Sequence, residues 1–297
     1  PDSGQMTDFS SILIVGERGM LAHAFREVLA GRGMAVTGGD LPQLDITDAS
    51  HVAAWFDRVR PTLVINCAAY TNVDGCEKPD SPAVAVNGLA VGTLAREARR
   101  LGATLVHFST DYVFDGTLRR PLKPDDPVAP QSAYGRSKLL GEQELQRADP
   151  PGWLLIRTAW LYGPNGSNFP QAMLSAAKAG KPLRVVDDQI GSPTYTLDLA
   201  QATLDLLQQG ASGIWHVSNA GQTSWFGFAK AIFQEFGIAP VSLEPITSEQ
   251  WKQIKPDSAI RPSYSVFDLS PLERLLARPM PSWQDALRRY RAALGKG

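Results

Sequence analysis

The sequence predicts an α/β fold, with a doubly wound parallel sheet followed by a smaller C-terminal α/β lobe. Short apolar runs such as Ser11–Val15 (SILIV) alternate with helical segments through the first half of the chain. This alternation is typical of parallel strands joined by crossover helices. A glycine turn, Gly16–Ala22, lies directly between the first strand and the first helix. With 297 residues and 43% apolar content, the chain can also bury the core of one large body and a smaller one.

The first strand runs into Gly16-Glu17-Arg18-Gly19-Met20-Leu21-Ala22 and a helix that we expect to end near Leu29. Backbone N–H groups and the helix dipole at such a junction form a cradle for a diphosphate. Gly16 permits the tight turn, and Gly19 permits close approach of the backbone. The loop therefore predicts a Rossmann-like dinucleotide-binding domain. We expect it to span 11–163, with later segments returning to it, and 164–297 to form mainly the substrate lobe.

The second predicted strand, Ala35–Thr37, leads to Asp40. Asp40 follows the glycine turn at roughly the spacing of about 20 residues at which an acidic side chain meets the adenosine ribose. A carboxylate there repels a 2′-phosphate, so Asp40 favours NADH over NADPH; the alternative is a solvated turn residue. Further on, Thr47 or Asp48 is expected to cap the next helix.

The third predicted strand, Thr62–Ile65, ends in the small residues of Asn66–Ala69. Small side chains at a strand end would let a cofactor pass closely over the sheet, although ordinary close packing gives the same pattern. A long helix, Ser81–Arg100, is expected next. A fifth strand is predicted over Trp153–Arg157, and an amphipathic helix over Ser282–Ala293 closes the chain.

The chemistry is expected between the strand Ala103–Ser109 and a helix from Ser132 to about Arg147. Thr110 follows that strand, at the edge where parallel sheets bind their ligands. Tyr134 and Lys138 lie one helical turn apart on one face. An ammonium group favours the phenolate form of a neighbouring tyrosine, which could then act as a general acid or base near neutral pH. With the dinucleotide loop, these residues predict hydride transfer, whereas a chance Tyr-x-x-x-Lys pair is the alternative.

Composition excludes several classes of protein. The net charge is −1 with no basic block, so nucleic acid is not an expected partner. No apolar run is long enough to span a bilayer, and the polar segment Pro1–Ser10 gives no sign of export. Two cysteines, Cys67 and Cys76, do not form a disulfide framework and indicate a reducing cytoplasm. No metal site is predicted, because metal-ligand spacing is absent among the four histidines, His23, His51, His107 and His216.

Together, the glycine turn, Ser109–Gly116 (STDYVFDG) and Tyr134–Lys138 (YGRSK) resemble the extended short-chain dehydrogenase/reductase family. The resemblance is closer to its dTDP-4-dehydrorhamnose reductase branch and runs from about Ile12 to Asp268. It implies that NADH or NADPH reduces the 4-keto group of a dTDP-linked 6-deoxysugar. Tyr134 would donate the proton, Lys138 would lower the tyrosine pKa and hold the nicotinamide ribose, and Thr110, or else Ser109, would align the ketone oxygen.

The resemblance also implies a set of binding residues. Those for the cofactor are Gly16, Gly19, Met20, Leu21, Asp40, Asp45, Ile46, Ala68, Ala69, Tyr70, Asn87, Tyr134 and Lys138. Those for the substrate are Val73, Asp111, Trp160, Asn168 and Arg261. The residues alone leave plainer alternatives at four of these positions: a surface residue at Asn87, a core tryptophan at Trp160, a helix N-cap at Asn168 and a surface salt bridge at Arg261.

The expected partner is a nucleotide-sugar, and a homodimer is left open. Some members of the family bind Mg²⁺ where subunits meet, but no acidic cluster here is diagnostic of it. Three other functions remain open. One is a sugar-nucleotide epimerase or dehydratase with tightly held NAD, and another is a reductase of a different keto-sugar nucleotide. The third is a non-catalytic regulatory subunit resembling that of methionine adenosyltransferase.

Overall fold

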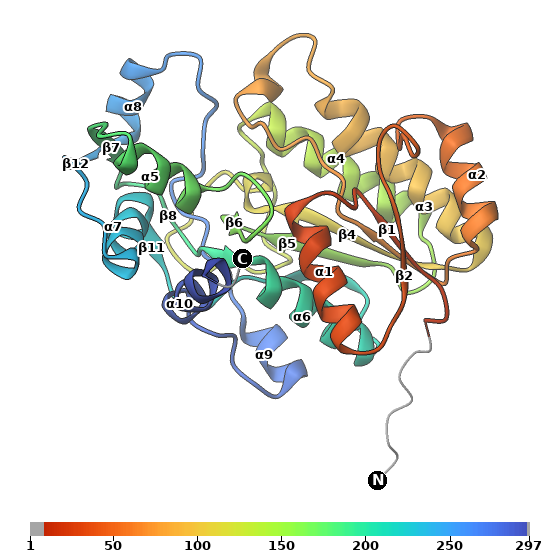
Figure 1. Cartoon of the computed structure of the whole chain (residues 1–297). Helices are drawn as coiled ribbons and strands as arrows, with labels where there is room; N and C mark the ends of the chain where they lie inside the picture. Colours follow the sequence, from red (N-terminus) through yellow and green to blue (C-terminus); the bar gives the residue numbers. More distant parts are fainter. Residues whose placement is uncertain (1–8, 296–297) are drawn as a thin grey trace.

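A six-stranded sheet lies at the centre of the computed structural model, which describes residues 9–295 (Figure 1). The strand order is β10-β5-β4-β3-β1-β2, and every neighbouring pair is parallel. The strands are β1 (Ile12–Val15), β2 (Val36–Gly39), β3 (Leu63–Asn66), β4 (Thr104–Thr110), β5 (Leu154–Thr158) and β10 (Gly213–His216). The predicted parallel sheet is confirmed. The polar segment expected at Pro1–Ser10 lies outside the described residues, apart from Phe9 and Ser10.

Helices cover both faces of the sheet, as the near-continuous apolar strands require. In β1, Ile12 and Ile14 pack with α1 (Met20–Gly31) and α6 (Thr196–Gln208). The alternate residues Leu13 and Val15 pack on the opposite face. The helices on that face are α2 (Ala49–Val59), α3 (Ala90–Leu101) and α4 (Ala133–Ala148). Two hydrophobic cores therefore hold the sheet between them.

Most predicted elements are present, with small shifts at their ends. The first strand ends at Val15 as predicted, and each of the next four ends one or two residues later than predicted, which makes Thr110 the last residue of β4. Asp48 caps α2 by accepting from the backbone N–H groups of Ser50 and His51. The helix expected over Ser81–Arg100 instead begins with a π-helical segment, η2 (Val84–Leu89), before α3. Single π-helical turns of this kind are frequent at functional sites.

A smaller α/β lobe lies beside the carboxyl ends of the strands (Figure 1). It contains α5 (Phe169–Lys178), α7 (Trp225–Phe236), α8 (Ser248–Ile254) and α10 (Trp283–Leu294), and the strand pair β7 (Leu183–Val186) and β12 (Leu243–Ile246). Two further pairs are β6 (Leu161–Tyr162) with β9 (Thr194–Tyr195), and β8 (Ile190–Gly191) with β11 (Thr223–Ser224). Short helices η1 (Gly75–Glu77), η3 (Asp111–Val113) and α9 (Ser270–Leu276) complete the fold.

The chain crosses between the two bodies more than once. α6 packs against α1, and β10 pairs with β5 at the edge of the sheet, although both follow residue 163 in the sequence. The division into 11–163 and 164–297 stays a prediction. Within the described residues, no helix is both long and apolar enough to cross a bilayer.

Candidate active site

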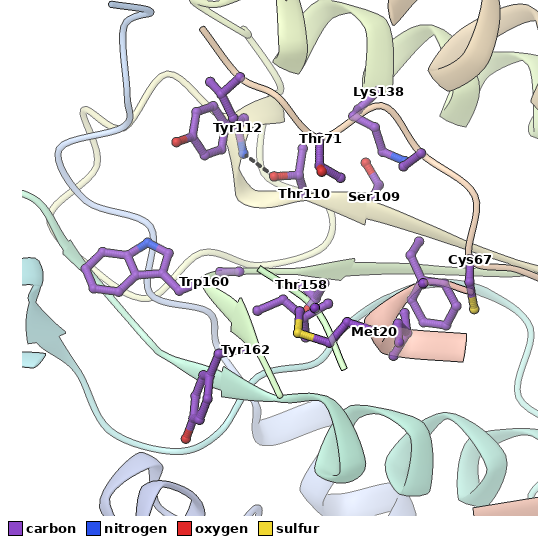
Figure 2. A pocket seen from close by; sticks show the side chains of 18 of the residues that line it. Met20, Cys67, Thr71, Ser109, Thr110, Tyr112, Lys138, Thr158, Trp160 and Tyr162 are labelled. Carbon is purple, nitrogen blue, oxygen red and sulfur yellow. Dashed lines mark hydrogen bonds between the residues drawn. The ribbon is translucent and has the colours of Figure 1, made fainter. Parts of the chain in front are cut away.

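A cavity of about 630 Å³ opens where the carboxyl ends of β1, β3, β4 and β5 face the second lobe (Figure 2). Its lining includes many of the predicted residues, namely Gly19, Met20, Leu21, Ala68, Ala69, Val73, Thr110, Asp111, Tyr134, Lys138 and Trp160. A smaller cavity of about 230 Å³ lies beside it and shares Gly19, Ala68 and Ala69. Its lining adds Gly16, Asp40, Asp45 and Ile46. Of the predicted residues, Tyr70, Asn87, Asn168 and Arg261 line neither cavity.

The glycine turn has the shape of an anion cradle. Gly16 has φ +75°, and a Cβ there would lie 2.7 Å from both the N and the Cα of Ala68. Only glycine fits this position, because a side chain would meet both steric strain and the neighbouring backbone. Gly19 is the N-cap of α1, and no side chain caps the first N–H groups of that helix. These donors face the shared wall of the two cavities and fit a dinucleotide diphosphate.

Asp40 directly follows β2 and lines the smaller cavity. Its carboxylate accepts hydrogen bonds from the backbone N–H groups of Leu41 (2.7 Å) and Arg18 (3.2 Å). The Arg18 side chain also forms an ion pair with it, with 3.4 Å between Nε and Oδ2. Arg18 was not singled out from the sequence. A positive group therefore lies beside the carboxylate that is expected to repel a 2′-phosphate.

Asn87 links three parts of the site from below. Its Oδ1 accepts from Tyr70 N (2.8 Å), and its Nδ2 donates to Tyr70 O (2.9 Å) and Ser137 Oγ (3.1 Å). The loop after β3 is thereby tied to η2 and to α4. Asn87 is 1% exposed, so it is a buried support and not the surface residue given as the alternative.

Thr110 forms the centre of a hydrogen-bond network. Its hydroxyl donates to Asp111 Oδ1 (3.0 Å) and accepts from Tyr112 N (3.2 Å), the bond drawn in Figure 2. The Thr110 hydroxyl lines the same cavity as Tyr134 and Lys138, and these two bonds hold it there.

Burial governs the ionisation of the two catalytic candidates on α4. It raises the pKa of Tyr134, as does the charge of Asp111, whereas the nearby Thr110 hydroxyl lowers it. The expected lowering of this pKa by Lys138 is not found, because Lys138 is not among the groups that shift it and burial is the largest cause. The raised pKa keeps the phenol protonated at neutral pH. Burial lowers the pKa of Lys138 to about 8, although the nearby Glu142 raises it.

Four oxygen atoms in the lining of the larger cavity are buried without a hydrogen-bond partner: Ser109 Oγ, Asp111 Oδ2, Thr158 Oγ1 and Tyr162 Oη. Unpaired buried polar atoms are costly, so they indicate groups that a ligand completes. Burial also raises the pKa of Asp111 to about 6. Thr158 was not predicted, although it ends β5 directly beside Thr110 in the sheet register. The sequence could have indicated Thr158, because it lies at the end of a predicted strand, as Thr110 does.

Asn168 and Arg261 take the plainer roles given as alternatives. Asn168 Oδ1 caps α5 by accepting from Gln171 N (3.0 Å), while Nδ2 donates to the carbonyls of Gly163 and Gly166. Arg261 forms an ion pair with Asp74 (3.0 Å). Binding of the substrate diphosphate by either residue stays a prediction.

The histidines of the core are structural. His107 Nδ1 accepts from Asn66 Nδ2 (3.1 Å), and His216 Nδ1 donates to Leu122 O (2.9 Å). Burial lowers the pKa of His216 to about 3 and that of His107 well below its usual value, so both are neutral. Among residues 9–295, no three His, Cys, Asp or Glu side chains are grouped to hold a metal ion. The described residues of one chain thus do not fit a magnesium site.

Together, the parallel sheet, the glycine cradle, and Tyr134 with Lys138 beside Thr110 define the class of protein, an extended short-chain dehydrogenase/reductase. A model of the RmlD substrate binding domain family matches residues 10–295, and the chain belongs to this family. The resemblance inferred from the motifs is confirmed.

Named relatives agree with this family. The chain is 42% identical over 281 residues to the spore coat polysaccharide biosynthesis protein SpsK of Bacillus subtilis, covering 95% of this chain and 96% of the relative. It is 41% identical over 286 residues to the dTDP-4-dehydrorhamnose reductase of Mycobacterium tuberculosis, with 93% and 90% covered. The crystal structure of the Bacillus anthracis dTDP-4-dehydrorhamnose reductase in complex with NADP has a TM-score of 0.89. It is 36% identical and covers 95% of this chain and 99% of its own.

Proposed function

We propose that the protein reduces the 4-keto group of a dTDP-linked 6-deoxysugar, converting dTDP-4-dehydrorhamnose to dTDP-rhamnose. The observation that carries the proposal is the convergence of Tyr134, Lys138 and Thr110 on one cavity with the glycine cradle. The substrate class is supported by the relatives, several of which are named dTDP-4-dehydrorhamnose reductase.

The chain's own residues account for cofactor binding. The Gly16–Gly19 turn would hold the diphosphate of NADH or NADPH, Asp40 the adenosine ribose, and Asp45 with Ile46 the adenine. Ala68 and Ala69 would lie under the nicotinamide, and Lys138 would hold its ribose. The bound nicotinamide would supply a hydride to the ketone carbon. Asp40 favours NADH in this proposal, with Arg18 reducing the preference.

Proton transfer is assigned to Tyr134. Negative charge grows on the ketone oxygen as hydride arrives, and an alkoxide is a stronger base than a phenolate, so the phenol donates its proton to it. A bond from Thr110 to the ketone would require its proton to leave Asp111, whereas the Ser109 hydroxyl has no partner and can bind the oxygen directly. Val73, Asp111 and Trp160 would hold the sugar.

A Tyr134→Phe variant tests the assigned proton donor. We expect turnover to fall about 10²- to 10⁴-fold, because this is the usual contribution of a general acid. Cofactor affinity should stay nearly unchanged. The measurement is NADH and NADPH oxidation over a panel of 4-keto nucleotide sugars. Tyr264→Phe is the matched control, since its hydroxyl bonds to Gln222 (3.2 Å) outside both cavities. Near-normal turnover of Tyr134→Phe would refute the role.

The same preparation distinguishes the other functions. An epimerase or dehydratase would purify with stoichiometric NAD and show no net cofactor oxidation. A regulatory subunit would show no turnover with any sugar on the panel and would co-purify with a larger catalytic chain. A reductase of another keto-sugar nucleotide would show turnover with a different sugar of the panel.

We also propose the compartment in which the enzyme acts and its state of assembly. Two free cysteines, Cys67 and Cys76, support a reducing compartment, for which we propose the cytoplasm. We propose a homodimer as the assembly, to be tested by sedimentation equilibrium. Sedimentation as a monomer at assay concentrations would reject it.

A further inference from the structure

The first turn of α4 carries the proposed proton donor, so the reaction depends on where that turn lies. Ala133 is the first residue of α4, and Tyr134 directly follows it. The opening N–H groups of a helix have no partner within the helix. Ser132 provides a local cap, because its hydroxyl accepts a hydrogen bond from Gly135 N (3.1 Å). The Ala133 N–H is left to a partner from outside the helix.

That partner is Glu77, the last residue of η1. Its Oε1 accepts a hydrogen bond from Ala133 N (2.8 Å), although the two residues are 56 positions apart in the sequence. The helix dipole favours a carboxylate at a helix N-terminus, and a hydrogen bond to a charged acceptor is stronger than a neutral one. Glu77 lines neither of the two cavities of the site. Any effect of Glu77 on the reaction therefore passes through α4.

The same turn of α4 also packs closely against η3. A Cβ at Gly135 would lie 2.2 Å from Tyr112 O, so only glycine allows this approach. The rings of Tyr112 and Tyr134 meet edge to face, with 5.3 Å between their centroids and an angle of 84° between their planes. The turn is thus held by two separate segments, and Glu77 supplies the hydrogen bond to its backbone.

The segment that carries Glu77 is itself held in place. Gly75 N donates to Asn72 Oδ1 (2.8 Å), and Cys76 N donates to Asn72 O (2.9 Å). Gly75 and Cys76 are both buried. In the same loop, Val73 lines the larger cavity, where it is expected to hold the sugar. Glu77 therefore joins the loop beside the sugar to the helix that carries the proton donor.

We propose that Glu77 is a positioning residue for the reduction, which holds the start of α4 so that the Tyr134 phenol meets the ketone oxygen of a sugar bound against Val73. The inference rests on the proposed function and deepens it by naming what aligns the proton donor. A misplacement of about 1 Å can cost about a hundredfold in rate, even when the mutation lies away from the reacting atoms. Loss of the Glu77 contact should therefore lower kcat and leave the binding of sugar and cofactor nearly unchanged.

The first test compares loss of the acceptor with its retention. In Glu77→Ala we expect kcat to fall about tenfold, with KM for the sugar and Kd for the cofactor nearly unchanged. Glu77→Gln keeps an oxygen acceptor and should retain most of the wild-type kcat. Ser282→Ala is the matched control, because it removes the cap of α10, which accepts from Asp285 N (3.2 Å) outside both cavities. It should leave kcat unchanged. A normal kcat in Glu77→Ala would overturn the inference.

The second test asks whether Glu77 acts through the proton donor. In the Tyr134→Phe background, Glu77→Ala should have little further effect on kcat, because the two residues form one unit. A full-sized further fall in that background would contradict the mechanism.

Amide hydrogen exchange tests the contact without any substrate. The Ala133 N–H should exchange several-fold faster in Glu77→Ala than in the wild type, because it loses its acceptor, whereas Glu77→Gln should keep most of the protection. Exchange in β4 should not change. Unchanged exchange at Ala133 in Glu77→Ala would show that Glu77 does not hold the start of the helix.

Two further measurements keep the outcomes separate. Thermal unfolding of each variant shows whether it is folded. If Glu77→Ala does not fold, Glu77→Met, which keeps the length of the side chain but has no oxygen, decides the inference by the same fall in kcat. Turnover of the wild type on the sugar panel tests the proposed function independently. If the wild type turns over no keto-sugar nucleotide, both proposals fail. If it does while Glu77→Ala keeps its kcat, only the positioning inference fails.

Discussion

Asp111 is a carboxylate that the fold keeps out of water. It is 2% exposed, and burial is the main reason that its pKa rises to about 6. The hydrogen bond from Thr110 and the nearby Ser265 hydroxyl lower the pKa, but they do not offset the burial. The folded protein therefore binds a proton here more tightly than the unfolded chain does.

Stability should consequently depend on the ionisation of Asp111. Its contribution is fully present below about pH 4 and is lost as the pH rises through about 6, because the folded pKa is the higher one. A rise from 3.8 to about 6 corresponds to about 3 kcal/mol. Asp111→Asn should match the wild type at pH 4 and be more stable at pH 7, measured by urea unfolding at both pH values. The exposed Asp125→Asn is the control; an equal gain there, or none in Asp111→Asn, would contradict the argument.

A second prediction at this scale tests the proposed preference for NADH. Asp40 lines the smaller cavity, and its carboxylate is expected to repel the 2′-phosphate of NADPH. Asp40→Asn keeps the size and most hydrogen bonds but removes the charge. We expect the ratio of kcat/KM for NADPH over NADH to rise about tenfold, which corresponds to about 1.4 kcal/mol. Asp45→Asn, at the same cavity, is the control. An unchanged ratio would show that the Asp40 carboxylate does not discriminate against the 2′-phosphate of NADPH.

At the scale of elements, α4 is anchored to the sheet by a buried ion pair. Arg157 at the end of β5 donates to both carboxylate oxygens of Glu142, from Nε at 3.0 Å and Nη2 at 2.7 Å. The two side chains are 4% and 1% exposed. A third bond joins Arg157 Nη1 to Pro124 O (3.0 Å). Since Glu142 follows Lys138 by one helical turn, this pair fixes the helix that carries the catalytic candidates.

Breaking this pair on one side should destabilise the fold strongly. Glu142→Ala leaves the guanidinium buried and unpaired, and we expect the free energy of unfolding to fall by about 3–5 kcal/mol. The double variant Glu142→Leu/Arg157→Met should recover most of the loss, because no buried charge remains. Glu244→Ala breaks the exposed pair with Arg184 and should cost less than about 1 kcal/mol. Equal costs for the buried and exposed pairs, by urea unfolding, would refute the anchor.

At the scale of the whole molecule, Asp74 joins the loop after β3 to the 255–261 segment of the chain. It accepts from Lys255 Nζ (2.7 Å), Ala259 N (3.0 Å) and Arg261 Nη2 (3.0 Å). Burial raises the pKa of Asp74, but these three bonds together lower it to about 2. The carboxylate clamp is therefore intact above about pH 4 and weakens as the pH falls through about 2.

Removing this clamp should loosen the 255–261 segment. In Asp74→Ala, we expect amide hydrogen exchange across 255–261 to become several-fold faster, because the Ala259 amide loses its acceptor. Exchange in β4 should not change. Asp257→Ala, an exposed neighbour in the same segment, is the control. Unchanged exchange in Asp74→Ala would show that other contacts hold the segment in place.

The predictable part of the fold is the part coded by neighbouring residues. Apolar runs located the first five strands of the central sheet to within two residues, and local side chains such as Asp48 and Ser132 cap the helices that follow them. The π-helical segment Val84–Leu89 was not predictable. It lies where the Asn87 amide bonds to Tyr70, a contact that a reading of local periodicity does not contain.

The predictable part of the site was also local. The glycine turn and the Tyr134–Lys138 pair are short motifs, and the structure brings them to adjoining cavities. Roles that depend on partners far away in the sequence could not be predicted. Arg261 is paired with Asp74, far away in the sequence, and Trp225 reaches Trp160 only because α7 folds back over the strand ends.

By itself, the sequence determined the parallel α/β architecture, the dinucleotide cradle and the tyrosine–lysine pair, because each depends on spacing along a few neighbouring residues. The tertiary structure alone decided which oxygen atoms stay unpaired in the cavity, that burial and not Lys138 governs the Tyr134 pKa, and that Trp225 stacks on Trp160. Solvation and packing are set by groups from distant parts of the chain, so they exist only once the two bodies meet.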